Sequence, residues 1–114
     1  MMRVSLFLML ACVLTGCKHL KPPTPLDQLN VQQMQGHAVF EQRCSVCHND
    51  RVDAPLHGPA LVGIFQKPSL PSGAAASDDR VRDTVMHGHG IMVGFGDQID
   101  SEDMADLLAY LHTL

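Results

Sequence analysis

Two cysteines and a histidine lie within five residues of one another, at Cys44, Cys47 and His48. On one turn of helix these positions are i, i+3 and i+4, so both sulfurs and the imidazole can face the same ligand. Cys-x-x-Cys-His is the pattern by which c-type haem is attached covalently to a polypeptide. The spacing therefore predicts one haem c, held through Cys44 and Cys47, with His48 as the proximal iron ligand.

Three other interpretations of the motif fit the rest of the chain less well. A thioredoxin-like redox pair belongs in a βαβ context, and no buried β-rich run flanks the motif. A structural zinc site usually needs four ligands, and although His87 and His89 are candidates, no second cysteine pair follows Cys47. A disulfide between Cys44 and Cys47 would close a very small loop and leave His48 without a role.

The elements that position the motif are predicted to be helices. Apolar spacing that includes Val31 and Met34 predicts a first helix over residues 31 to 46, which runs into the motif. Residues 49 to 76 are rich in proline and glycine and predict a loop around the cofactor, with a short helical turn at 60 to 65.

Two further helices are predicted from their start and stop signals. Ser77 as N-cap and Gly88 as stop predict a helix over residues 78 to 87. Ser101 as N-cap, followed by two acidic residues, predicts a last helix. Its apolar positions at helical spacing are Met104, Leu107, Leu108, Leu111 and Leu114.

Length and composition predict one small acidic domain. The chain has 114 residues, no tryptophan, and 8 basic residues against 12 acidic ones. A domain of this size buries limited apolar surface, so a haem would supply a large part of its core. The acidic balance argues against a nucleic acid partner.

The N-terminus is predicted to direct export and lipidation. Residues 1–16 combine Arg3 with an apolar stretch of eleven residues, which as a helix would rise only about 16 Å against a hydrocarbon core of about 30 Å. Leu-Thr-Gly-Cys at 14–17 resembles the lipobox of bacterial lipoproteins, which implies cleavage before Cys17 and acylation of that residue. Lys18 would be compatible with transfer to an outer membrane. An ordinary secretory cleavage remains the alternative. Residues 17–30 then form a proline-rich extended tether.

Residues 31–114 resemble the small class I c-type cytochromes, which implies an all-α fold of three main helices and loops wrapped around one covalently bound haem. Gly36 and Phe40, ahead of the motif, look like the family's first helix, where such residues contact the last helix. The segment at 58–61 looks like the family's Gly-Pro-x-Leu segment, which implies that the Pro59 carbonyl accepts a hydrogen bond from His48. Leu107 to Leu111, with Tyr110, looks like the closing helix.

The resemblance also supplies a second axial ligand. Residues 90–95 are similar to the family's methionine loop, which implies that Met92 coordinates the iron opposite His48. Met34 and Met104 lie on apolar stripes and are expected in the core. Val93 stands where the family often has proline, and His57, His87 and His89 offer competing nitrogens; among these, His87 or His89 remain the alternative ligands.

Protein ligands at both axial positions predict electron transfer and not catalysis, with no small-molecule substrate. The expected protein is an extracytoplasmic, periplasmic carrier that is lipid-anchored to a membrane through Cys17. Its expected partners are transient redox proteins or membrane respiratory complexes. The alternatives are a haem enzyme or gas sensor with a labile or absent Met92 ligand, and an electron-transfer subunit of a larger dehydrogenase or oxidase complex.

Overall fold

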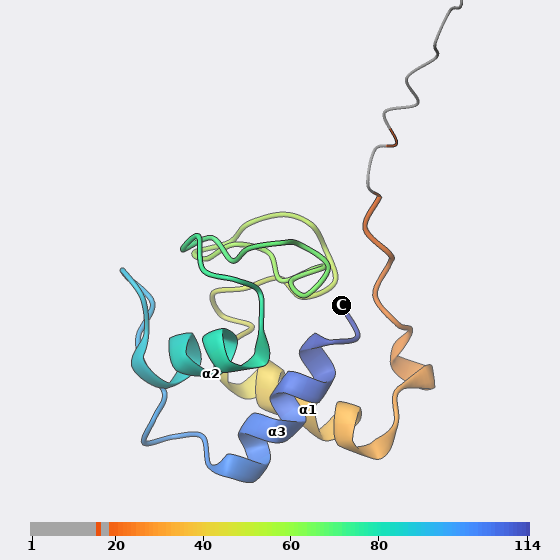
Figure 1. The fold of residues 1–114 in the computed structure, drawn as a ribbon. Helices are drawn as coiled ribbons and strands as arrows, with labels where there is room; N and C mark the ends of the chain where they lie inside the picture. Colours follow the sequence, from red (N-terminus) through yellow and green to blue (C-terminus); the bar gives the residue numbers. More distant parts are fainter. Residues whose placement is uncertain (1–15, 17–18) are drawn as a thin grey trace, which may run out of the picture.

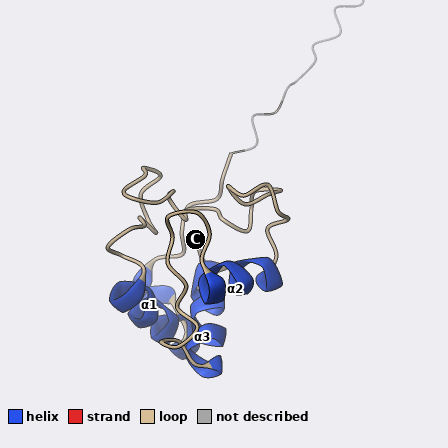
Figure 2. Ribbon diagram, turned by 90° about the vertical axis from the view of Figure 1, so that its left-hand side faces the viewer, coloured by secondary structure: helices blue, strands red, loops and turns tan. Residues whose placement is uncertain are grey.

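The computed structural model describes residue 16 and residues 19–114, and their only regular elements are helices. They are η1 (Leu26–Gln28), α1 (Val31–Arg43), α2 (Asp78–His87) and α3 (Ser101–Leu111). Figures 1 and 2 show the three α-helices gathered on one side, with the loop over residues 49–76 on the other. The prediction of an all-α fold is confirmed.

Each of the three α-helices begins at a side chain that satisfies free backbone N–H groups. The Asn30 side chain and the Gln33 side chain form a capping box at the start of α1. Ser77 caps α2, and Gly88 ends it with a φ of 80°, both as predicted. The prediction for α3 is wrong by one residue, because Asp100 and not Ser101 is the N-cap; its carboxylate accepts hydrogen bonds from the N–H groups of Glu102 and Asp103. An aspartate carboxylate satisfies both groups and also places negative charge at the helix N-terminus.

Two predicted helical boundaries differ from the structure. α1 ends at Arg43 instead of residue 46, and residues 44–47 continue as hydrogen-bonded turns. The predicted helical turn at 60–65 consists of turns at 62–66, closed by bonds such as Ile64 N–H to the Leu61 carbonyl. Gly63, with a φ of 66°, interrupts any helix there.

The helices α1 and α3 cross with their backbones in contact. A Cβ on Gly36 would lie 1.9 Å from the Asp106 carbonyl oxygen and 2.7 Å from Tyr110 Cβ, so only glycine permits this approach. Beside it, the Phe40 and Tyr110 rings lie with their centroids 6.0 Å apart, and both side chains are fully buried. The implied contact of Gly36 and Phe40 with the last helix is therefore present.

The apolar stripe predicted for α1 is partly wrong, whereas that of α3 is right. Val31 is 77% exposed and Met34 is 42% exposed, because α1 buries the face that carries Gly36, Val39 and Phe40. All five predicted apolar positions of the last helix are buried: Met104, Leu107, Leu108, Leu111 and Leu114.

The proline-rich segment before α1 lies against the domain. The Lys21 N–H donates to Gln66 Oε1 at 2.7 Å, and the Thr24 N–H donates to the Thr113 carbonyl at 2.8 Å. Residues 21–24 are thus held by both the 49–76 loop and the C-terminal end, which shortens the predicted tether. The predicted signal peptide and the lipidation site at Cys17 lie outside the described residues, except for Gly16. No helix in the described part of the chain is long and apolar enough to cross a membrane.

We expect Gly36→Ala to lower the free energy of unfolding of the haem-loaded protein by about 1–3 kcal/mol, because the added methyl group forces α1 away from α3. Helix propensity acts in the opposite direction, by about 1 kcal/mol in favour of alanine, so a measured loss would show that packing dominates. Guanidinium unfolding followed by circular dichroism measures the change. Gln35→Ala, at an exposed position of the same helix, should change stability by less than about 0.5 kcal/mol.

Candidate functional site

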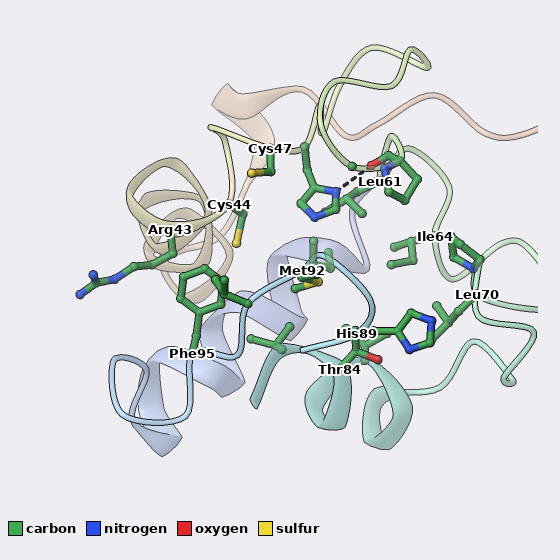
Figure 3. A pocket seen from close by; sticks show the side chains of 18 of the residues that line it. Arg43, Cys44, Cys47, Leu61, Ile64, Leu70, Thr84, His89, Met92 and Phe95 are labelled. Carbon is green, nitrogen blue, oxygen red and sulfur yellow. Dashed lines mark hydrogen bonds between the residues drawn. The ribbon is translucent and has the colours of Figure 1, made fainter. Parts of the chain in front are cut away.

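A cavity of about 320 Å³ lies where the motif, the 49–76 loop, α2, the α2–α3 connection and α3 meet. Its lining is almost entirely apolar, and Leu61, Ile64, Leu70 and Phe95 surround it in Figure 3. Cavities of this size and character are typical of small-molecule and cofactor sites.

The cysteines of the motif reach this cavity from the end of α1. The His48 N–H donates to the Cys44 carbonyl at 2.9 Å, so the helical path continues for one more turn after Arg43. Cys44 and Cys47 both line the cavity, and the Cys44 sulfur points toward Phe95 and Met92 (Figure 3). The two sulfurs are not joined to each other. The structure therefore brings together the residues that the spacing predicted to share one ligand.

The imidazole of His48 is fixed by two neighbours in the 49–76 loop. Its Nδ1 lies 2.7 Å from the Pro59 carbonyl oxygen, and because a carbonyl only accepts, Nδ1 carries the proton and donates. This tautomer leaves Nε2 with a free lone pair for a metal. A Cβ on Gly58 would lie 2.5 Å from Cε1 of the ring, so the loop can reach His48 only with glycine at this position.

Met92 comes from the α2–α3 connection and also lines the cavity, with its sulfur pointing inward (Figure 3). The turn that carries it is closed by two hydrogen bonds between the backbones of His89 and Met92, of 2.9 and 3.1 Å. The Phe95 N–H then donates to the Val85 carbonyl at 2.8 Å, which ties the connection back to α2. Val93, in place of the proline that is often found there, is 65% exposed and does not interrupt these bonds.

The other candidate histidines differ in their positions. His89 lines the cavity beside Met92, and so does His57 from the opposite loop. His87 does not line it, and instead its Nδ1 lies 3.0 Å from the Asp83 carboxylate on an exposed part of α2. Of the two histidines predicted as alternative iron ligands, His89 lies at the cavity and His87 does not.

Comparison with known proteins identifies the family of the domain. The model of the family described as cytochrome c oxidase, cbb3-type, subunit III matches residues 31–111. The chain belongs to this family of c-type cytochrome domains. It is accordingly a small c-type cytochrome with a covalently bound haem c and the all-α fold of class I, and haem-based electron transfer is the function of this domain.

Two relatives differ greatly in length from each other. The chain is 30% identical over 96 residues to one of the subunits of nicotinate dehydrogenase from Pseudomonas putida; the alignment covers 76% of this chain and 8% of that protein. It is 26% identical over 97 residues to cytochrome c2 of Rhodopila globiformis, with 71% of this chain and 92% of the relative covered. The chain therefore spans nearly the whole of one relative and a small part of the other.

The environment of Cys44 suits a sulfur without charge. Burial, reinforced by the neighbouring Cys47 sulfur, raises the pKa of the Cys44 thiol to about 11. In a c-type cytochrome this sulfur is a thioether, which has no proton to lose and fits an apolar wall. The residues present therefore fit a covalently bound haem.

Reasoning from the sequence misses two parts of the site, the contact of Gly58 and the position of Phe95. The sequence marks Gly58 only as part of a motif, because its contact with the His48 ring depends on where the loop folds. The sequence places Phe95 in the methionine loop without a contact to the cofactor, although it lines the cavity; His57, expected only as one of the competing nitrogens, lines the cavity as well. No periodic signal marks them, because they lie in irregular loops.

We expect Gly58→Ala to destabilise the cytochrome by about 1–3 kcal/mol, since the new methyl group overlaps the His48 ring and displaces it from Pro59. Guanidinium unfolding of the haem-loaded protein measures the loss. Gly96→Ala is the matched control, because its Cβ would meet nothing closer than the Met86 carbonyl oxygen at 3.2 Å. Equal losses in the two variants would contradict a specific role for Gly58.

Proposed function

We propose that the chain is a single-haem electron carrier in which Cys44 and Cys47 bind the porphyrin, while His48 and Met92 occupy the two axial positions of the iron. The observation that carries the proposal is that all four side chains line one apolar cavity, although Met92 comes from a separate part of the chain. When bound, haem iron supplies a one-electron couple between its ferrous and ferric states.

The contribution of the chain is to hold the ligands in place. His48 presents Nε2 because Pro59 holds the proton on Nδ1, which also raises the basicity of the ring. The hydrogen-bonded turn at 89–92 fixes the Met92 backbone, so that its thioether would be held at the cavity as a ligand for the haem iron. A site with both positions filled by protein has no place for a substrate or for oxygen.

The exposed side chains next to the cavity suggest how electrons reach a partner. Ile91 is 92% exposed and Val93 is 65% exposed, and both also line the cavity. A redox protein that contacts this turn therefore lies next to the cofactor. A transient redox partner is consistent with this exposed apolar contact and with the similarity to cytochrome c2.

A second arrangement is supported by the other relative. The match to 8% of a nicotinate dehydrogenase polypeptide shows that a similar domain can form part of a much larger redox protein. A stable association of this chain with a dehydrogenase or oxidase complex would use the same site for electron transfer. Co-purification with a redox enzyme at fixed stoichiometry would favour this arrangement over a transient carrier.

Met92→Ala tests the axial ligand. We expect the ferric protein to move from a low-spin toward a high-spin absorption spectrum, and the ferrous protein to gain carbon monoxide binding, because the sixth position opens. The reduction potential should fall, since a methionine ligand raises it. Met86→Ala is the matched control, because Met86 packs against the core but does not line the cavity.

His89 is the residue that could replace the lost ligand. If Met92→Ala remains low-spin, the double variant with His89→Gln should become high-spin, whereas His87→Gln should have no such effect. Strong binding of carbon monoxide by the wild-type protein would contradict His/Met ligation and favour the haem enzyme or gas sensor.

We also propose that the carrier is extracytoplasmic and is held at a membrane by a lipid on Cys17. The support comes from the sequence around Cys17, which resembles a lipobox, and from the covalent haem, which is typical of extracytoplasmic cytochromes. Two or more acyl chains anchor a protein stably, whereas one binds only marginally. Diffusion along a membrane would keep the carrier close to membrane-bound redox partners.

Cys17→Ser should abolish acylation and release the cytochrome from the membrane fraction of a lipoprotein-processing bacterium. Mass spectrometry of the N-terminus and membrane partitioning measure the two effects. Cys12→Ser, within the apolar stretch, is the control and should leave both unchanged. Unaltered membrane retention of the Cys17 variant would refute the anchor.

A further inference from the structure

Three side chains of metal-ligating type meet outside the haem cavity. His37 and Glu41 lie on α1, and Asp50 follows the haem motif; their ligand atoms all lie within 4.8 Å of one another. None of the three lines the haem cavity. The cluster is therefore a separate feature that electron transfer does not explain.

The geometry of the pair on α1 suits a shared cation. Nε2 of His37 lies 3.6 Å from Oε1 of Glu41, which is too long for a hydrogen bond. Ligand atoms bound to a tetrahedral zinc ion at about 2.1 Å lie about 3.4 Å from each other. Side chains four residues apart on a helix face the same way, so a small movement of Asp50 would complete three ligands.

Asp50 is oriented by a buried partner. The Tyr110 hydroxyl, on α3, donates a hydrogen bond to Oδ2 of Asp50, and Oδ1 has no hydrogen-bond partner in the described part of the chain. Metal-binding carboxylates are commonly held by such outer partners.

The local charge also favours a divalent cation. The cluster contains two carboxylates, and Arg51, the residue after Asp50, donates to the Tyr110 oxygen at 3.4 Å and to the Thr24 carbonyl. Asp50 forms no ion pair within 4.0 Å among the described residues. Bound zinc would therefore neutralise two carboxylates that no lysine or arginine pairs directly.

We propose that His37, Glu41 and Asp50 form a binding site for Zn²⁺ or a similar divalent transition metal, with water as the fourth ligand. One imidazole and two carboxylates match the ligand preferences of this class of ion. The site joins α1 to the segment that follows the haem motif. It does not depend on which residues coordinate the haem iron.

The same chain contains a natural control for an isolated pair. His87 and Asp83 are also spaced i, i+4 on a helix, and Nδ1 lies 3.0 Å from the carboxylate. No third ligand joins them, since the described residues contain one cluster of three such groups. If a helical His–carboxylate pair alone were sufficient, zinc would bind at both places.

Isothermal titration of zinc chloride into the chelator-treated, haem-loaded protein tests the site. We expect one equivalent of zinc to bind. Each of the variants His37→Gln, Glu41→Gln and Asp50→Asn should weaken the zinc affinity at least about tenfold, because loss of even an outer hydrogen-bond partner of a metal ligand usually has an effect of this size. His87→Gln should retain the wild-type affinity. Tyr110→Phe should weaken binding about 10–100-fold, because Asp50 loses its orienting donor.

Zinc-edge X-ray absorption identifies the ligands without interference from iron. One imidazole with oxygen neighbours at about 2.0–2.1 Å would support the site. Two or more imidazoles, a sulfur ligand, or equal affinities in wild type and His37→Gln would overturn it. An unchanged visible spectrum in the His37 and His87 variants shows that the haem site is intact, so failure here is distinguishable from failure of the proposed haem ligation.

Discussion

The backbone contact between α1 and α3 at Gly36 determines where the rest of the site can form. Because no side chain separates the helices there, Phe40 and Tyr110 pack directly beside the crossing. The end of α1 is thereby brought over Leu107 and Leu111, which line the same cavity as Cys44. The cysteine motif depends on this crossing for its position, although it contributes nothing to the contact itself.

Local signals predicted the helices well because each is started by a neighbouring side chain. Ser77 and Gly88 bound α2 as expected, and the one-residue difference at Asp100 arose because two adjacent residues can both cap a helix. The apolar stripe of α1 failed for a different reason. Val31 and Met34 are apolar, as core residues usually are, but both are exposed. The face of α1 that is buried is the one that carries Gly36, because α3 approaches there, and a pattern of hydrophobic residues does not include a glycine contact.

In the site too, the residues close together in the sequence could be predicted from their spacing, whereas the residues far apart in the sequence could not. Cys44, Cys47 and His48 lie within one turn, so their spacing alone placed them on one ligand. The bond from His48 to Pro59 and the position of Met92 depend on residues 11 and 44 positions further along the chain, and only resemblance to a family could suggest them. The role of Gly58 could not be predicted from the sequence. A Cβ atom at this position would lie 2.5 Å from the His48 ring, and this contact depends on how the loop folds.

Two hydrogen bonds on either side of Asn49 connect the haem motif to the remainder of the domain. His48 donates to the Pro59 carbonyl in the loop, and two residues later Asp50 accepts from Tyr110 in α3. Fixing a chain at two points so close together restricts the backbone between them, at an entropic cost of about 1–2 kcal/mol per residue. The chain loses this conformational entropy once, when it folds. The segment is therefore already ordered when the iron changes oxidation state. A cation on Asp50 would strengthen the second of these attachments, and so would act on the same short segment that presents the His48 imidazole.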